Sequence, residues 1–128
     1  MFEVGVVSEF EAQHHLRGDF GDASRPHRHE YKAEVKISGD MLDEWGMLFD
    51  IGVLQEKLIE VCTSLFHRNL NEMGVFMHEN PTAENLSKYI FIQIFPIISG
   101  KESLRMKVTV WESENAFASY GTLDKPFL

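Results

Sequence analysis

The chain has 128 residues, of which 44% are hydrophobic, and it carries a formal net charge of −8. This length favours one domain over residues 1–128, with enough apolar side chains for a real core and a size consistent with assembly of several copies. The acidic balance argues against non-specific binding to nucleic acid or to an anionic membrane surface.

Cysteine content and the chain start indicate the compartment. A single cysteine, Cys62, excludes an intrachain disulfide and suits a reducing environment. Residues 1–13 contain no Lys or Arg, so they lack the basic beginning of a signal peptide. No apolar run approaches the roughly 18 residues needed to cross a bilayer. We therefore expect a cytoplasmic protein.

Alternation of apolar and polar residues predicts two strands in the first third of the chain. The first covers residues 1–16, and the second covers residues 27–38 after a loop rich in Gly, Asp and Ser. The inward face of the first strand holds Phe2, Val4, Val6, Phe10, Ala12 and His14. The inward face of the second holds His27, His29, Tyr31, Ala33, Val35 and Ile37.

Two helices and two further strands are expected after residue 39. Asp50 can cap a helix that runs to about Phe66. Asn80-Pro81-Thr82 opens a second helix, which ends near Pro96 or Ile98. Strands over residues 104–112 and 116–122 complete the order ββααββ. This order indicates an α+β domain with an antiparallel four-stranded sheet and two helices on one face.

Three histidines share the inward parity of the first two strands. His27 and His29 lie two residues apart, so both imidazoles leave the same apolar face, and His14 has matching parity on the neighbouring strand. Three histidines with an open fourth position are typical of a catalytic zinc site. The alternative is a set of half-buried histidines that only make hydrogen bonds.

Glu112 ends the third strand on its apolar parity, after Val108 and Val110. An inward carboxylate needs a partner, and a ligand with N–H donors would provide one. The alternative is that the strand has reached the rim of the sheet at this position and that Glu112 is exposed to solvent.

These residues fall into blocks that resemble the 6-pyruvoyl-tetrahydropterin synthase family, which includes the 6-carboxytetrahydropterin synthases of the queuosine pathway. The blocks are Phe10-x-Ala12-x-His14-x-Leu16, His27-Arg28-His29-Glu30-Tyr31, Gly46-Met47-Leu48-Phe49-Asp50, His67-Arg68-Asn69-Leu70-Asn71, Asn80-Pro81-Thr82-Ala83-Glu84-Asn85, and Glu112-Ser113 followed by Ala118 and Tyr120. They occur in the family's order and cover nearly the whole chain.

The resemblance implies a fold, a metal and a substrate class. The implied tunnelling fold joins the sheets of several subunits into a barrel, usually a hexamer of two trimers, with active sites between subunits. The resemblance further implies zinc on His14, His27 and His29, a pterin ring anchored by Glu112, and Thr82 near that ring. The implied reaction removes triphosphate from 7,8-dihydroneopterin triphosphate and rearranges its side chain, within tetrahydrobiopterin or queuosine biosynthesis.

The sequence departs from the family pattern at two catalytic positions. Ala23 stands where the family has its catalytic cysteine, and Phe66 stands where an aspartate precedes the histidine that matches His67. Cys62 lies mid-helix and does not match the cysteine position. The reaction needs a base within reach of substrate carbons. We expect Asp22 or His67 to serve, in preference to Glu30, which strand alternation directs to the opposite face.

Three functions are compatible with this pattern. The first is a zinc-dependent lyase or synthase acting on a pterin triphosphate. The second is an aldolase-type cleavage that gives a 6-hydroxymethyl pterin. The third is a zinc-containing pterin-binding protein without turnover. Arg25, Arg28 and Arg68 are the candidates for contacting a triphosphate.

Overall fold

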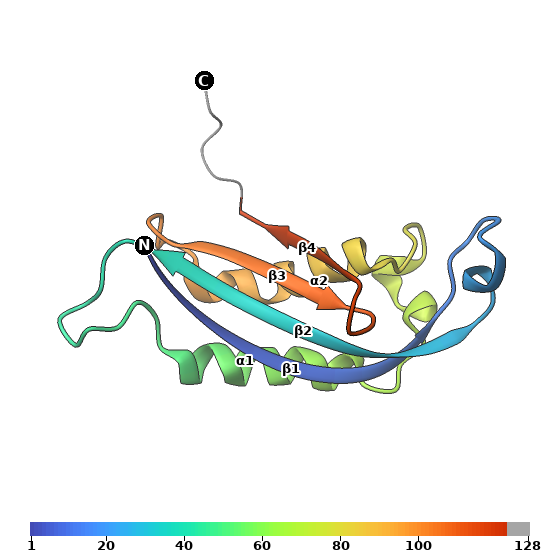
Figure 1. Ribbon diagram of the computed structural model, residues 1–128, viewed down its shortest axis with the longest axis horizontal. Helices are drawn as coiled ribbons and strands as arrows, with labels where there is room; N and C mark the ends of the chain where they lie inside the picture. Colours follow the sequence, from blue (N-terminus) through green and yellow to red (C-terminus); the bar gives the residue numbers. More distant parts are fainter. Residues whose placement is uncertain (123–128) are drawn as a thin grey trace, which may run out of the picture.

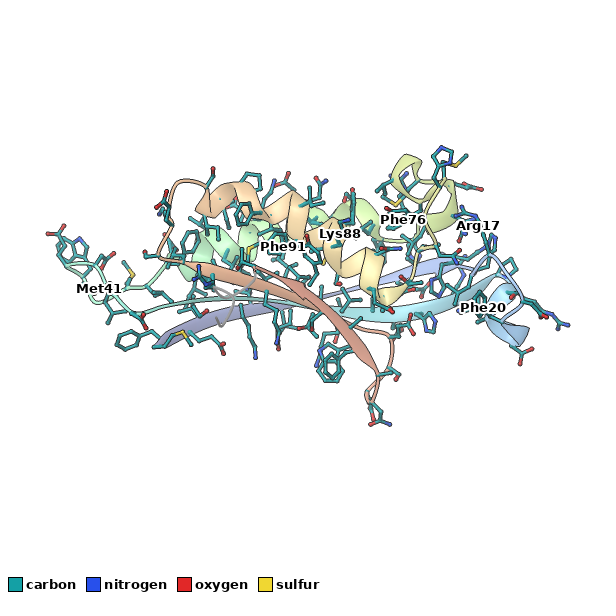
Figure 2. All side chains as sticks on the ribbon, turned by 90° about the horizontal axis from the view of Figure 1, so that it is seen from above. Arg17, Phe20, Met41, Phe76, Lys88 and Phe91 are labelled. Carbon is teal, nitrogen blue, oxygen red and sulfur yellow. The ribbon has the colours of Figure 1, made fainter. Side chains whose placement is uncertain are left out.

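The computed structural model describes residues 1–122. Its sheet is antiparallel and has the strand order β1-β2-β3-β4 (Figure 1). The strands are β1 (Phe2–His14), β2 (His27–Gly39), β3 (Arg105–Trp111) and β4 (Phe117–Gly121). Two helices, α1 (Ile51–Leu65) and α2 (Ala83–Ile94), lie together on one side of this sheet (Figure 2). The expected α+β class and element order are confirmed.

The β1–β2 hairpin has an unbroken register over the full length of both strands. Pairing runs from Phe2 opposite Gly39 to His14 opposite His27. Because side chains alternate between faces, this register fixes which residues lie under the helices. It also places the end of β1, the start of β2 and the loop between them at the end of the molecule where Arg17 and Phe20 lie in Figure 2.

The core lies between the helix-covered face of the sheet and the two helices. Its fully buried members include Tyr31, Ile37, Leu54, Leu58, Leu65, Leu86, Ile90, Ile94 and Met106. The expected cap of α1 is present, because the Asp50 carboxylate accepts hydrogen bonds from the backbone N–H groups of Gly52 and Val53 at 2.9 and 3.3 Å. Within residues 1–122, no helix combines the length and the apolar character that crossing a bilayer requires.

The beginning of α2 differs from the expected one. Its cap is Thr82, whose hydroxyl oxygen accepts from the backbone N–H of Asn85 at 3.1 Å, so Pro81 lies outside the helix. The Asn80 amide is used elsewhere, on the backbone of Arg17. At its other end, α2 passes at Phe95 into a 3-10 turn that continues to Ile98.

Two further expectations at chain ends and loops need correction. Alternation predicts an inward Phe2, but 48% of this residue is exposed. The reason is that Phe2 lies at the rim of the sheet, where it lines a hollow with Met47 and Ile51 and is not covered by a helix. The loop after β1 is not wholly irregular, since residues Gly21–Ser24 form a short 3-10 turn.

The connection between the helices is fastened to the edge of β1. The backbone N–H of His67 donates to the Glu11 carbonyl oxygen at 2.7 Å, and that of Gln13 donates to the Arg68 carbonyl oxygen at 2.9 Å. His67 is the one described non-glycine residue with a positive φ, 61°. This left-handed backbone conformation is uncommon for a residue with a Cβ, and the two strand contacts hold it.

Two asparagine side chains then bind the loop after β1 to the same connection. Asn71 is buried; its amide oxygen accepts from the His15 N–H at 2.8 Å and its amide nitrogen donates to the His15 carbonyl at 3.0 Å. Asn80 makes the equivalent pair with Arg17, at 2.7 and 3.1 Å. Together they hold the residues that follow His14 against the segment that leads into α2.

Candidate metal centre and adjoining cleft

His14, His27 and His29 converge at the end of the β1–β2 hairpin. Their ring centroids are 4.5, 5.0 and 4.8 Å apart, and one nitrogen from each ring can be chosen so that all three lie within 4.8 Å of one another. Nitrogens on a tetrahedral zinc ion at Zn–N distances near 2.0–2.1 Å would be separated by about 3.3 Å. The three imidazoles could therefore hold a metal ion with small side-chain rotations.

The hydrogen bonds behind two of these rings direct the same nitrogen toward the centre. His14 Nδ1 lies 2.7 Å from the Pro81 carbonyl oxygen, and His27 Nδ1 lies 2.7 Å from the Arg25 carbonyl oxygen. A carbonyl can only accept, so each Nδ1 carries the proton and each Nε2 presents a lone pair. The two Nε2 atoms are only 2.9 Å apart. Two facing lone pairs repel unless a metal ion or an added proton lies between them, and carbonyls behind the rings are the usual support of metal-binding histidines.

Burial keeps the imidazoles of His14 and His29 in the form that binds a metal. His14 is only 2% exposed, and its burial lowers its pKa to about 4. Burial also lowers the pKa of His29, although the nearby Glu112 carboxylate opposes this shift. A neutral imidazole is the metal-binding form, so the site offers lone pairs at neutral pH.

Two adjoining hollows form one cleft next to the histidines. The smaller, about 340 Å³, is lined by His14, Leu16, Asp22, Ala23, His27, His29 and Glu112. The larger, about 490 Å³, is lined by Leu16, Thr82, Ala83, Glu84, Glu112, Ala116, Phe117 and Ala118. They share Leu16 and Glu112, so a ligand in the larger hollow can extend to the imidazoles. Both volumes are in the range of small-molecule sites.

Glu112 stands at the junction of the two hollows. It follows the last residue of β3, and its backbone N–H donates to the Ala116 carbonyl at 3.0 Å, which fixes the turn into β4. It is half-buried, and its carboxylate acts electrostatically on His29. The sequence left two alternatives, an inward carboxylate facing a ligand and an exposed residue at the rim of the sheet. Each is partly correct, because the strand does end here and the side chain still lines the cleft.

Asp22 and Ala23 both lie in the hollow of the histidines. They belong to the 3-10 turn Gly21–Ser24, and the Ala23 carbonyl accepts the backbone N–H of Leu16 at 2.8 Å. This hydrogen bond folds the loop back over the end of β1 and places residues 22 and 23 beside the imidazoles. Thr82 lines the adjoining hollow. Its oxygen accepts from Asn85, which leaves its hydroxyl proton free to donate.

His67 is not brought to the histidine cluster. Its Nδ1 lies 3.5 Å from Oε1 of Glu11, whose side chain leaves β1 on the face opposite to that of His14, and 59% of the His67 side chain is exposed. Arg28 lies on this outer face too, where its guanidinium donates to Glu11 at 2.9 Å. Glu30 also lines an outer-face hollow with Glu11, as the alternation indicated. His67 is therefore directed away from the cleft of its own chain, and it could act only on the cleft of another copy.

Cys62 is part of the hydrophobic core. It is 3% exposed, and burial raises the pKa of its thiol to about 11, so it has no access to the cleft. Sequence reasoning named Leu16 and Glu84 within motifs without giving them a place in the site, and it missed the carbonyls of Pro81 and Arg25. Backbone carbonyls carry no side-chain signal, and only the tertiary structure could identify them.

Comparison with known proteins gives a consistent result. Residues 3–122 match the sequence profile of a family described as 6-pyruvoyl tetrahydropterin synthase. The 6-pyruvoyl tetrahydrobiopterin synthase of Dictyostelium discoideum is 35% identical over 103 residues, which cover 79% of this chain and 74% of that protein. The 6-carboxy-5,6,7,8-tetrahydropterin synthase of Rickettsia felis is 28% identical over 127 residues, covering 85% of this chain and 92% of that protein.

Solved structures of similar proteins have the same fold. The 6-pyruvoyl tetrahydropterin synthase of Caenorhabditis elegans superposes with a TM-score of 0.82 at 26% identity, covering 95% of this chain and 96% of that one. The Plasmodium falciparum synthase of the same name superposes with a TM-score of 0.77 at 19% identity, covering 94% and 97%, which supports the fold alone. The single-chain architecture is therefore that of the tunnelling fold.

Proposed function

This chain belongs to the 6-pyruvoyl tetrahydropterin synthase family, and we propose that it is a zinc-dependent lyase or synthase acting on 7,8-dihydroneopterin triphosphate or a related pterin. The observation that carries this proposal is the position of Glu112, between a hollow that can hold a ring and the cluster of His14, His27 and His29.

The set of three imidazoles favours zinc as the metal. Nitrogen ligands in a set of three, with a fourth position open toward a cleft, are the donor pattern of catalytic zinc sites. The ion, when bound, would polarise an oxygen of the substrate side chain. The carbonyls of Pro81 and Arg25 would hold His14 and His27 in the required tautomer.

The larger hollow is the proposed place of the pterin ring. The ring carries adjacent N–H groups, and the Glu112 carboxylate can accept two of them with charge-assisted hydrogen bonds. The free hydroxyl proton of Thr82 can be donated to a ring acceptor in the same hollow. A ring anchored in this way would direct its side chain along Leu16 toward the histidines.

Proton transfer is assigned to Asp22 and His67. Asp22 lines the hollow of the histidines, next to the position where the family has its cysteine, so its carboxylate can take a proton from a substrate side chain there. His67 lies on the opposite face, so it would serve the cleft of a neighbouring subunit in the proposed oligomeric barrel, a trimer or hexamer. Active sites between subunits, which the family resemblance implies, would allow this division.

Aldolase-type cleavage is the second candidate. Its initial proton comes from a side-chain hydroxyl, which is a stronger acid than a carbon and asks less of a carboxylate such as Asp22. The placement of Ala23 where the family has a cysteine favours this candidate, since Cys62 is buried in the core and cannot replace the lost thiol.

Incubation of the zinc-loaded protein with 7,8-dihydroneopterin triphosphate, with mass spectrometry of the products, tests the proposal. A 6-pyruvoyl or 6-carboxy pterin would establish synthase activity, and a 6-hydroxymethyl pterin would establish the aldolase. The His27→Ala variant is the control for metal dependence. Unchanged substrate, with zinc and pterin both bound, would overturn the catalytic proposal in favour of a binding protein.

A further inference from the structure

We propose that Glu11 is the positioning residue of His67, supplying from β1 the carboxylate that Phe66 cannot supply. This inference rests on the proposed function, in which His67 transfers protons. Glu11 Oε1 lies 3.5 Å from His67 Nδ1, and the Glu11 backbone carbonyl accepts the His67 backbone N–H at 2.7 Å. One strand residue therefore contacts both the ring and the main chain of this histidine.

The backbone of His67 depends on this contact. Its φ of 61° is a conformation that side chains with a Cβ rarely adopt, and such strain persists only where surrounding contacts determine it. The next residue, Arg68, accepts the backbone N–H of Gln13 through its carbonyl, so the strained residue lies inside a short stretch paired with the edge of β1. The result is a fixed direction for the Cα–Cβ bond of His67, from which the imidazole extends.

Phe66 cannot orient the ring by hydrogen bonding. Its ring centroid is 3.8 Å from that of His67, and 52% of the residue is exposed. It can restrict the imidazole by contact, but it has no acceptor for a ring N–H. In the described part of the chain, Glu11 supplies the one carboxylate within 4.0 Å of this imidazole.

Glu11 is itself held in place. It lies within the hydrogen-bonded ladder of β1, opposite Glu30 of β2. The Arg28 guanidinium donates to Glu11 Oε1 at 2.9 Å, and the Glu11 side chain is 32% exposed. Glu9, Glu30 and Phe66 line the adjoining hollow of about 330 Å³. The contact with Arg28 thus helps to hold the Glu11 carboxylate next to the imidazole.

The contact has a chemical consequence for His67. A carboxylate 3.5 Å from Nδ1 favours the tautomer that carries its proton there, because a small rotation of either side chain would let Nδ1–H donate to it. Nε2 is then left with its lone pair and can accept a proton. With 59% of the side chain exposed on the outer face, that nitrogen is available to a neighbouring subunit's cleft. Glu11 thus fixes the tautomer and direction of the base without touching the substrate.

The ring ¹⁵N resonances of His67 test this proposal directly. They are measured in the zinc-loaded protein above the pH at which the imidazole titrates, and are assigned by their loss in His67→Gln. We expect the wild type to show protonated Nδ1. We expect Glu11→Ala to shift the ring toward the tautomer mixture of an unconstrained imidazole. An unchanged tautomer in Glu11→Ala, or a wild type protonated on Nε2, would overturn the proposal.

Glu3→Ala is the matched control. Glu3 lies on the same face of β1 at its other end, where its carboxylate is 3.7 Å from the Lys36 ammonium in another exposed ion pair. We expect this variant to keep the wild-type His67 resonances and the wild-type kcat. A His67 change of equal size in both variants would show a general effect of removing a charge from this face, and would also overturn the proposal.

Turnover provides the second measurement. If the protein converts a pterin, Glu11→Ala should lower kcat by about tenfold or more with KM changed by less than about twofold, since a support of a catalytic group typically contributes factors of this size. A full kcat in Glu11→Ala would overturn the positioning role. If the wild type has no turnover, the proposed function fails, while the tautomer measurement still decides whether Glu11 orients His67.

Discussion

The Nε2 atoms of His14 and His27 lie 2.9 Å apart, and the Nδ1 atom of each ring lies 2.7 Å from a backbone carbonyl oxygen. Because the carbonyls fix the protons on Nδ1, this approach of two lone pairs is unfavourable unless a positive charge lies between them. A metal ion that binds both nitrogens removes this repulsion, as does a proton shared between them, so the contact is compatible with a metal site.

His27→Ala is expected to remove the metal. The wild type should contain close to one zinc ion per chain, and the variant should contain well below that amount, because two imidazoles remain of three. Metal content by inductively coupled plasma mass spectrometry is the measurement. His78→Ala removes an exposed histidine outside the cluster and should keep the wild-type content. Equal zinc in His27→Ala and the wild type would contradict this assignment.

Metal-free protein is expected to lose stability as the pH falls. Burial lowers the pKa of His14 from an ordinary 6.5 to about 4, so between these values the unfolded chain binds more protons than the folded one. The contribution of His14 to the free energy of unfolding is thus fully present above about pH 6.5 and is lost as the pH falls toward 4. Urea unfolding at several pH values measures it, and His14→Gln should show a flatter dependence in this window.

Asp22→Asn should lower kcat by about 100-fold or more, because the amide cannot accept a proton from the substrate. Zinc content and pterin affinity should stay near wild type, since Asp22 lies outside the three-imidazole set and next to the ring hollow rather than within it. Steady-state kinetics with product detection is the measurement. The Asp19→Asn variant changes an exposed carboxylate of the same loop and should keep the wild-type kcat. Full turnover in Asp22→Asn would assign the proton transfer to another group.

Glu112→Ala should weaken pterin binding by about tenfold to 100-fold. The reason is that it removes a charged hydrogen-bond acceptor, for which losses of about 1.5–3 kcal/mol are typical. Quenching of intrinsic fluorescence by a non-reactive pterin gives the affinity. Glu114→Ala, in the same turn but exposed and absent from the lining of the cleft, is the control. Equal affinities in the two variants would place the ring elsewhere.

Asn71→Ala should lower the free energy of unfolding by about 1–3 kcal/mol, since it leaves the partly buried N–H and carbonyl of His15 without their partners. Denaturant unfolding of the zinc-free protein measures this change without a contribution from the metal. Asn115→Ala, at an exposed turn, should change stability by less than about 0.5 kcal/mol. If Asn71→Ala lowered the free energy of unfolding no more than Asn115→Ala does, the Asn71 hydrogen bonds would not be needed to hold the loop after β1 in place.

The sequence was sufficient to place the strands and the inward histidines. Alternation in β2 assigns His27 and His29 to the buried face because a strand has a side-chain period of two residues. The convergence of His14 needed the hairpin register, which brings it opposite His27. That register depends on how the loop between the strands folds, and parity alone restricts it without fixing it.

Other features depend on contacts between distant residues. Asn80 and Thr82 are both suitable helix caps, and the choice of Thr82 follows from the use of Asn80 on the backbone of Arg17, 63 residues away. The outward position of His67 follows from a strained φ and from pairing with the edge of β1. No local pattern reports either contact, so a motif can identify His67 without indicating which face of the sheet it occupies.

The three imidazoles also have a consequence for the order of folding. All three come from one hairpin, and contacts between residues close in sequence form early, with hairpins closing in about 1–10 μs. The Pro81 carbonyl that supports His14 is 67 residues away and arrives only when α2 docks. A metal ion bound by the hairpin would therefore stabilise this early folding nucleus before the helices pack. Its presence during refolding would change the refolding rate as well as the stability of the folded protein.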